Sequence, residues 1–291
     1  MLLKEIKEGN ALLEFSPKEL AKLDLSLLLR DRQLWFSATS EEQTSPLYLH
    51  KWSLTEPYAE SLKTLFFEET LLAIPYQRSE LALDEGTFFL LPEDLHGVAS
   101  AKEWSLPFLS NEHRDRELLQ ITLSELPATL HYAIESELYH FCQRSFPLPH
   151  FTHPVATLID LTLKRSRGTT SDILLVRLGE LTMDLILARG GHLRLANRYH
   201  ISALEDQIYY ITLIWNRFGL RQEGSRLYIY SHLDLEPLHT ALSDKIRQVY
   251  CNHYLDNIAS VNHSLNSNGA TALLQKTQQM PPEWIFQMLC V

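Results

Sequence analysis

The feature that most constrains the fold of this chain is that one order of predicted elements occurs twice. In the second half, three strands are predicted. They correspond to a nearly continuous apolar run, a second apolar run ended by Gly190-Gly191, and an alternating segment, and the first two are expected to be covered on both faces. A helix with an apolar stripe follows, then a strand and a further helix. The predicted ranges are 172–178, 181–188, 193–201, 202–219, 226–230 and 237–249.

The first half repeats the beginning of this order. Strands are predicted at 23–30, 34–38 and 47–54, and Thr55 then caps a helix with Pro57 in its first turn. Superposed without a gap, 147 positions apart, Leu34 matches Leu181 and Arg30 matches Arg177. The starts of the two helices coincide as well, where Ser202 and Glu205 predict a capping box in the second half. Chance similarity between apolar strands is the alternative, but an internal duplication better explains the shared offset.

The chain length of 291 residues suits two domains. We expect the first at 1–169 and the second at 170–291, with a seam near residues 168–171 and an irregular insertion at about 92–116. Between the repeats we predict a strand, a strand-to-helix segment, a proline-rich turn and a helix, at 118–123, 128–146, 146–149 and 154–164.

Charge and processing signals narrow the partners and the compartment. The formal net charge of −10 argues against a nucleic-acid or anionic-membrane surface, which needs a basic face. No run approaches the 18 apolar residues of a membrane span, and the first residues lack the apolar core of a signal peptide. Three separate cysteines do not form a disulfide pattern. We therefore expect a cytoplasmic protein without nucleic-acid or membrane partners.

Two copies of such a unit resemble the superfold of actin, sugar kinases and heat-shock chaperone ATPases. In that superfold a nucleotide lies between two ribonuclease-H-like domains. Its second phosphate loop reads Asp, any, Gly, Gly, Gly, Thr, any, Asp, and Gly179, Thr182 and Asp184 stand at matching positions. The chain is also similar, over nearly its full length, to an uncharacterised bacterial family thought to have an actin-like fold. The cytoplasmic actin-like platform proteins of type II secretion and pilus assembly are more distant relatives.

The resemblance implies an α/β fold with two ribonuclease-H-like domains, each a mixed sheet flanked by helices, but the nucleotide signatures are degraded. Arg177 stands where the family has its Mg²⁺-associated Asp, and Glu180 and Leu181 replace two glycines. The matching line of the first half, 29–35, and the place of the adenosine loop, 230–234, contain no glycine. Phosphate loops need glycine so that backbone N–H groups can approach the oxygens. With only 10 glycines in the chain, we expect the fold without ordinary ATP hydrolysis, and neither cofactor nor catalytic residue is assigned.

The candidate site is the remnant of these phosphate loops. Its residues are Arg30, Arg177, Gly179, Thr182 and Asp184. If both hairpins face one cleft, the two arginines could form an anion site. The alternative, which we favour, is a pair of solvated or salt-bridged arginines at strand ends.

Other residue clusters favour structural roles. His150 and His153, and Cys251 with His253, lack a second pair at zinc spacing, so no metal site is predicted among the 13 histidines. The aromatic residues of the helix at 202–219 favour core packing, although Tyr209 or Tyr210 could face a partner. We expect the apolar segment at 281–289 to dock on the chain itself rather than on a partner.

These observations favour a non-catalytic protein that acts by binding or scaffolding, with an unidentified protein partner. One alternative is a divergent ATPase or kinase in which Thr182 and Asp184 keep phosphate or metal roles. Another is a small-molecule-binding protein that uses the cleft between its domains.

Overall fold

The computed structural model describes residues 6–40, 47–84, 86–96, 103–104 and 115–252. Their contacts divide them into two compact units. The first unit takes in the described residues up to Ile121 together with Thr129–Pro154. The second takes in Thr122–Ala128 and the described residues from Val155 onward. The segment 281–289 and most of the predicted insertion lie outside the described residues.

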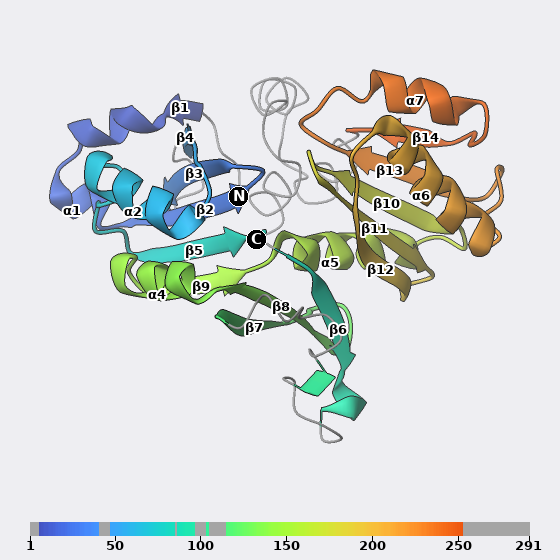
Figure 1. Cartoon of the computed structure of the whole chain (residues 1–291), viewed down its shortest axis with the longest axis horizontal. Helices are drawn as coiled ribbons and strands as arrows, with labels where there is room; N and C mark the ends of the chain where they lie inside the picture. The colour runs from blue at the N-terminus through green and yellow to red at the C-terminus, as the bar shows by residue number, and fades with distance from the viewer. Residues whose placement is uncertain (1–5, 41–46, 85, 97–102, 105–114, 253–291) are drawn as a thin grey trace. The chain divides into compact units, whose positions relative to one another are not determined.

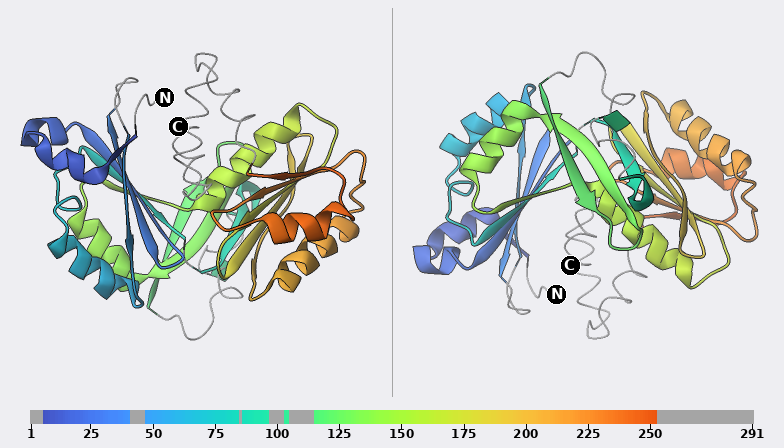
Figure 2. Two further views of the ribbon diagram at one scale, coloured as in Figure 1. Left: turned by 90° about the horizontal axis from the view of Figure 1, so that it is seen from above. Right: turned by 90° about the horizontal axis from the view of Figure 1, so that it is seen from below.

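The first unit is built on a six-stranded mixed sheet in the order β1-β4-β3-β2-β5-β9 (Figure 1). Helices α2 and α4 lie side by side in this unit (Figure 2), joined by the ion pair of Lys63 with Glu137 and by the ring contact of Phe66 with Phe141. A smaller sheet has the order β6-β8-β7. The elements of these sheets and their helices are β1 (Ile6–Glu8), α1 (Pro17–Leu20), β2 (Leu23–Arg30), β3 (Gln33–Ser40), β4 (Leu47–Ser53), α2 (Tyr58–Glu68), β5 (Arg78–Leu83), β6 (Phe88–Pro92), β7 (Arg116–Thr122), β8 (Ala128–Glu135), α4 (Ser136–Ser145) and β9 (Pro149–Thr152), with 3₁₀ turns at Gly9–Glu14 and Glu93–Leu95.

The second unit is built on a five-stranded sheet in the order β12-β11-β10-β13-β14. Leu174 and Val176 of β10 and Leu227 and Ile229 of β13 face a core that includes side chains of α6 and α7. The intervening residues of β13 point the other way, where Arg165 of α5 stacks on Tyr228 at 4.3 Å. The elements are α5 (Pro154–Arg167), β10 (Ile173–Leu178), β11 (Thr182–Arg189), β12 (His192–His200), α6 (Leu204–Arg217), β13 (Arg226–Tyr230), α7 (Glu236–Ser243) and β14 (Val249–Cys251).

The two sheets share one topology. In each, three antiparallel strands in hairpin order (β2-β3-β4 and β10-β11-β12) are followed by two strands that extend the sheet in parallel from its first strand. The predicted strands at 23–30 and 226–230 have the observed bounds, and β5 begins and ends within one residue of β13 at the offset of 147. The repeated unit is therefore present in the fold, with β1 added at the edge of the first sheet.

The gapless superposition of the halves is wrong at the first hairpin. Arg30 pairs with Gln33 across the two-residue turn Asp31-Arg32, whose residues both have positive φ. In the second unit Leu178 pairs with Met183 across a four-residue loop. As a result Leu34 is a buried strand residue, whereas its gapless match Leu181 lies in the loop and is 60% exposed. The register of the sheet, rather than the sequence offset, defines the equivalent positions.

Helix α6 shows how local chemistry sets an element's limits. Gly219, with a φ of 62°, and Leu220 donate backbone hydrogen bonds to Asn216 and Trp215, which is a Schellman ending and confirms the predicted glycine cap. At the other end the prediction of Glu205 in a capping box is wrong. The Asp206 carboxylate accepts hydrogen bonds from the Ser202 backbone and hydroxyl, and these hold its pKa below the ordinary value.

Three other predicted limits differ from the structure. Pro57 precedes α2 instead of lying in its first turn, so the helix begins at Tyr58. The last predicted helix ends at Ser243, and Val249 begins strand β14, because the parallel partner β13 supplies backbone hydrogen bonds that sequence pattern does not show. Pro149, expected in a turn, begins strand β9 beside β5.

Candidate functional site

Two of the predicted site residues, Arg177 and Asp184, lie directly opposite each other on β10 and β11. They form an ion pair whose side chains are both 0% exposed. Arg198 of β12 lies opposite Asp184 on its other side and donates two hydrogen bonds to the carboxylate, at 2.7 Å from Nε and 3.0 Å from Nη2. These three residues, the buried charge triad, replace the exposed acidic group expected at a metal-assisted phosphate loop.

The sequence prediction missed Arg198. Its position was readable in part, because the alternation of β12 places Arg198 on the opposite face from Leu195 and Tyr199, which pack against the core. Which residue of β11 it meets depends on sheet register, and no local pattern gives that.

The loop between β10 and β11 closes on itself. The backbone N–H of buried Gly179 donates to the carbonyl of Thr182 at 2.8 Å, and no residue of 178–183 has a positive φ. Glu180 and Leu181 at its tip are exposed. The loop therefore lacks the left-handed residues that turn successive N–H groups toward one phosphate.

The equivalent hairpin of the first unit also carries buried charges. Arg30 is 3% exposed, and its Nε lies 2.9 Å from an oxygen of Asp31 and 3.6 Å from one of Asp84. The second oxygen of Asp84 lies 3.6 Å from Nε2 of His153, a fully buried ring. Both arginines are thus salt-bridged within their own unit, which agrees with the favoured interpretation except that they are buried rather than solvated.

Hydrogen bonds of Ser231 hold the segment that stands at the place of the adenosine loop. Its hydroxyl donates to the carbonyl of Leu178 at 2.8 Å and accepts from the backbone of Leu233 at 3.0 Å. Its backbone N–H and C=O are both bonded to the side-chain amide of Asn252. These bonds join the ends of β10, β13 and β14, so the backbone and hydroxyl groups of Ser231 are used within the protein.

The residues at the three degraded signatures do not fit Mg²⁺-nucleotide. Asp184 is enclosed by two guanidinium groups, and the N–H of Gly179 is bonded within its own loop. No group of three or more His, Cys, Asp or Glu side chains that could hold a metal ion occurs among the described residues. We therefore derive no step through a nucleotide or a metal.

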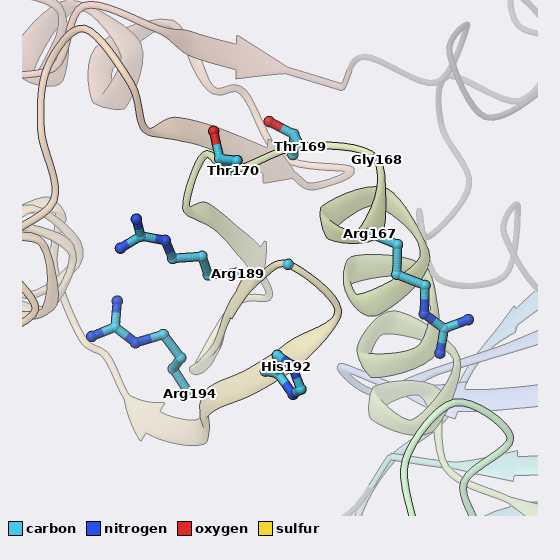
Figure 3. Close-up of a pocket in the computed structure, with 8 residues that line it drawn as sticks. Arg167, Gly168, Thr169, Thr170, Arg189, His192 and Arg194 are labelled. Carbon is cyan, nitrogen blue, oxygen red and sulfur yellow. The ribbon is translucent and has the colours of Figure 1, made fainter.

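A basic hollow of about 720 Å³ lies elsewhere in the second unit, between the end of α5 and the turn from β11 to β12 (Figure 3). Its lining includes the arginines Arg167, Arg189 and Arg194 and the ring of His192, and Thr169 and Thr170 add hydroxyl groups. A hydrogen bond of 2.8 Å from the N–H of Gly191 to the hydroxyl of buried Ser166 joins the turn between β11 and β12 to α5. The sequence prediction missed this hollow, since its cations come from three separate elements.

A β-bulge shapes the hollow. Leu195 pairs with Leu187 and Leu193 with Ala188, so Arg194 is the extra residue on β12. Bulges re-aim side chains at sheet edges. Here Nη1 of Arg194 reaches the Asp172 carboxylate at 2.8 Å, and Nη1 of Arg189 lies 3.9 Å from the second oxygen of that carboxylate.

Comparison with solved structures identifies the fold. The chain is similar to a protein of unknown function with an actin-like ATPase fold from Bacteroides thetaiotaomicron, with 21% identity and a TM-score of 0.73 over 90% of this chain and 98% of that one. It is also similar to a chain of the PilM-PilN type IV pilus biogenesis complex, with 13% identity and a TM-score of 0.57 over 92% and 97%. The fold is therefore actin-like, as expected.

Within the described residues no helix is both long and apolar enough to cross a membrane. None of the curated proteins matches the sequence. Residues 13–249 match the family described as protein of unknown function DUF3822, and because this match covers most of the chain, the protein belongs to that family.

Proposed function

We propose that this protein is a non-catalytic member of the actin-like fold that acts by binding a protein partner. The observation that carries the proposal is the buried charge triad, in which both oxygens of Asp184 are taken up by arginines. A carboxylate held this way cannot also coordinate a metal or orient a water molecule on a phosphate. At the phosphate loop, the hydrogen bond between Gly179 and Thr182 supports the same absence of nucleotide binding. At the place of the adenosine loop, the hydrogen bond of Ser231 to Leu178 supports it as well.

Partner binding is supported by the second structural relative, which was solved as a complex of PilM with PilN. We propose the cytoplasm as the compartment, and Cys142 and Cys251 are not joined in a disulfide, in keeping with it. The predicted domain limits of 1–169 and 170–291 and the roles of the five candidate residues likewise remain proposals. The small-molecule alternative at a cleft between domains has no observation in its favour.

Thermal unfolding with and without ATP and Mg²⁺ tests the proposal. A ligand present at 100 times its dissociation constant stabilises by about 2.7 kcal/mol. For a chain of this size that corresponds to a rise in Tm of roughly 4–5 °C. We expect no rise at millimolar ATP and no release of phosphate.

A variant separates loop-mediated binding from an unspecific effect. Thr182 is only partly buried, and its described hydrogen bond uses its carbonyl, so Thr182→Ala leaves the loop intact. A dose-dependent rise in Tm that Thr182→Ala abolishes would support the divergent ATPase or kinase and refute the proposal.

A further inference from the structure

The strongest unassigned feature of the second unit is the electrostatic excess around the basic hollow. Its arginines pair with two carboxylates. Asp172 pairs with Arg189 and Arg194, and Glu125 pairs with Arg167 and also with the nearby Lys164. The Asp160 carboxylate lies beside Glu125, so four cations and three carboxylates leave a local excess of one positive charge on a chain whose formal net charge is −10. A concentration of charge opposite in sign to that of the whole chain marks a surface for an acidic ligand.

The cations still have donors available to a ligand. The side chains of Arg167 and Arg189 are each 52% exposed, and that of Arg194 is 34% exposed. An arginine carries five N–H donors, and Arg189 is no closer than 3.9 Å to its carboxylate. A ligand carboxylate could therefore add to these groups without displacing Asp172.

The arrangement of the cations distinguishes a chain of carboxylates from a single small anion. Arg189 and Arg194 run side by side in one direction, whereas Arg167 lies across the hollow and points the other way (Figure 3). Its stem packs against Gly191, where an added Cβ would lie 2.8 Å from Cγ of Arg167, and its guanidinium pairs with Glu125. Cations that flank a hollow of about 720 Å³ instead of converging in it do not suit one phosphate.

The strand that leaves the hollow suits an extended ligand. β12 is an edge strand that, among the described residues, pairs with β11 alone. The bulge at Arg194 prevents regular pairing beside the hollow, but residues 195–200 continue in regular register and leave one row of backbone groups at the edge. An extended segment could use its acidic side chains at the hollow and its backbone along this row.

We propose that the basic hollow, together with the edge of β12, binds an acidic, extended segment of a protein partner. This inference rests on the proposed function and names the chemistry of the partner. The cationic contacts are Arg189 and Arg194, whose side chains run side by side at the hollow.

The test uses the full chain and a fluorescein-labelled octapeptide of alternating Asp and Gly, with an Asn-Gly octapeptide as the uncharged control. Binding is measured by fluorescence anisotropy at about 20 mM and 200 mM salt. We expect saturable binding of the Asp peptide, weakened severalfold at high salt because exposed charge pairs are screened. The Asn peptide should not bind.

Matched variants locate the site. Arg189→Gln with Arg194→Gln should weaken binding about tenfold or more, since each charge-assisted hydrogen bond contributes more than a neutral one and 1.4 kcal/mol corresponds to a factor of ten. Arg247→Gln removes a more exposed arginine elsewhere in the unit, 71% exposed, and should change affinity by less than about twofold. Circular dichroism confirms that each variant is folded.

Four outcomes would overturn the proposal. They are no binding of the Asp peptide at low salt, equal binding of the Asn peptide, equal losses in the Arg247 variant, and displacement of the peptide by inorganic phosphate at matched charge concentration. Concentration-dependent self-association that the double variant abolishes would also overturn it, because the occupant would then be a second copy. The ATP measurement decides the proposed function separately, so the two failures are distinguishable.

Discussion

Replacing Asp184 by Asn tests whether the buried charge triad is held together by its single carboxylate. The side chains of Arg177 and Asp184 are 0% exposed and that of Arg198 is 3% exposed, so solvent cannot take over the role of Asp184. Asn can accept from only one oxygen and turns its NH₂ group toward a guanidinium. Removing one partner of a buried ion pair costs about 3–5 kcal/mol, because the charge that remains is uncompensated.

That cost is a large share of the roughly 5–15 kcal/mol by which a folded domain is stable. With a urea dependence of about 2 kcal/mol per molar, the unfolding midpoint should fall by roughly 1.5–2.5 M. Circular dichroism in urea measures the midpoint. Hydrogen exchange of peptides from β10 and β11 shows whether the loss of protection lies in the second unit. A fall of less than about 0.5 M would refute the reasoning.

An apolar replacement of all three residues supplies the control. In Arg177→Met, Asp184→Leu, Arg198→Met no charge stays buried, and such replacements are often neutral or stabilising. We expect the midpoint of this triple variant to lie above that of Asp184→Asn. If the triple variant were less stable than the single one, lost packing rather than uncompensated charge would explain the effect.

Two further perturbations have outcomes set by local geometry. Gly219→Ala should destabilise by about 1–2 kcal/mol, because the φ of 62° is unfavourable for a residue with Cβ while no neighbouring atom lies within 4 Å of that Cβ. Gly168→Ala, equally unobstructed but without a positive φ, should be neutral or slightly stabilising in the same urea titration, and an equal loss at both positions would contradict the argument. Asp206→Asn should lower the Tm at pH 7, since hydrogen bonds from Ser202 lower the pKa of the carboxyl and the ionised form stabilises the fold. That stability is present above the ordinary pKa of 3.8 and is lost as the pH falls through the lower pKa of the folded state. The difference in Tm between the variant and the wild type should therefore vanish in acid. A difference in Tm that stays constant with pH would contradict the argument.

The sequence prediction succeeded where local pattern carries the information. The apolar run of β10 and the alternation of β12 predicted their strands, and Gly219 predicted the end of α6. The prediction failed where a neighbour in space decides. Val249 continues a helical pattern in the sequence but forms a strand, because β13 offers it a parallel partner.

The candidate site divides in the same way. The loss of glycines from the expected nucleotide loops, where only Gly179 remains, was visible in the sequence and indicated that the nucleotide signatures are degraded. What replaced them was not visible: the two oxygens of Asp184 are taken up by arginines from two different strands. In the aromatic cluster Trp215 is buried, as core packing predicted, whereas Tyr209 is 58% exposed, as the alternative allowed.

The sequence by itself determined the repeated order of elements, because strand and helix periodicities and caps depend on neighbours along the chain. Only the tertiary structure decided which charges meet. Sheet register set Asp184 between Arg177 and Arg198, and the bulge on β12 turned Arg194 toward Asp172. The physical reason is that electrostatic interactions depend on distance in space and on burial, and both arise only when strands distant in sequence are paired.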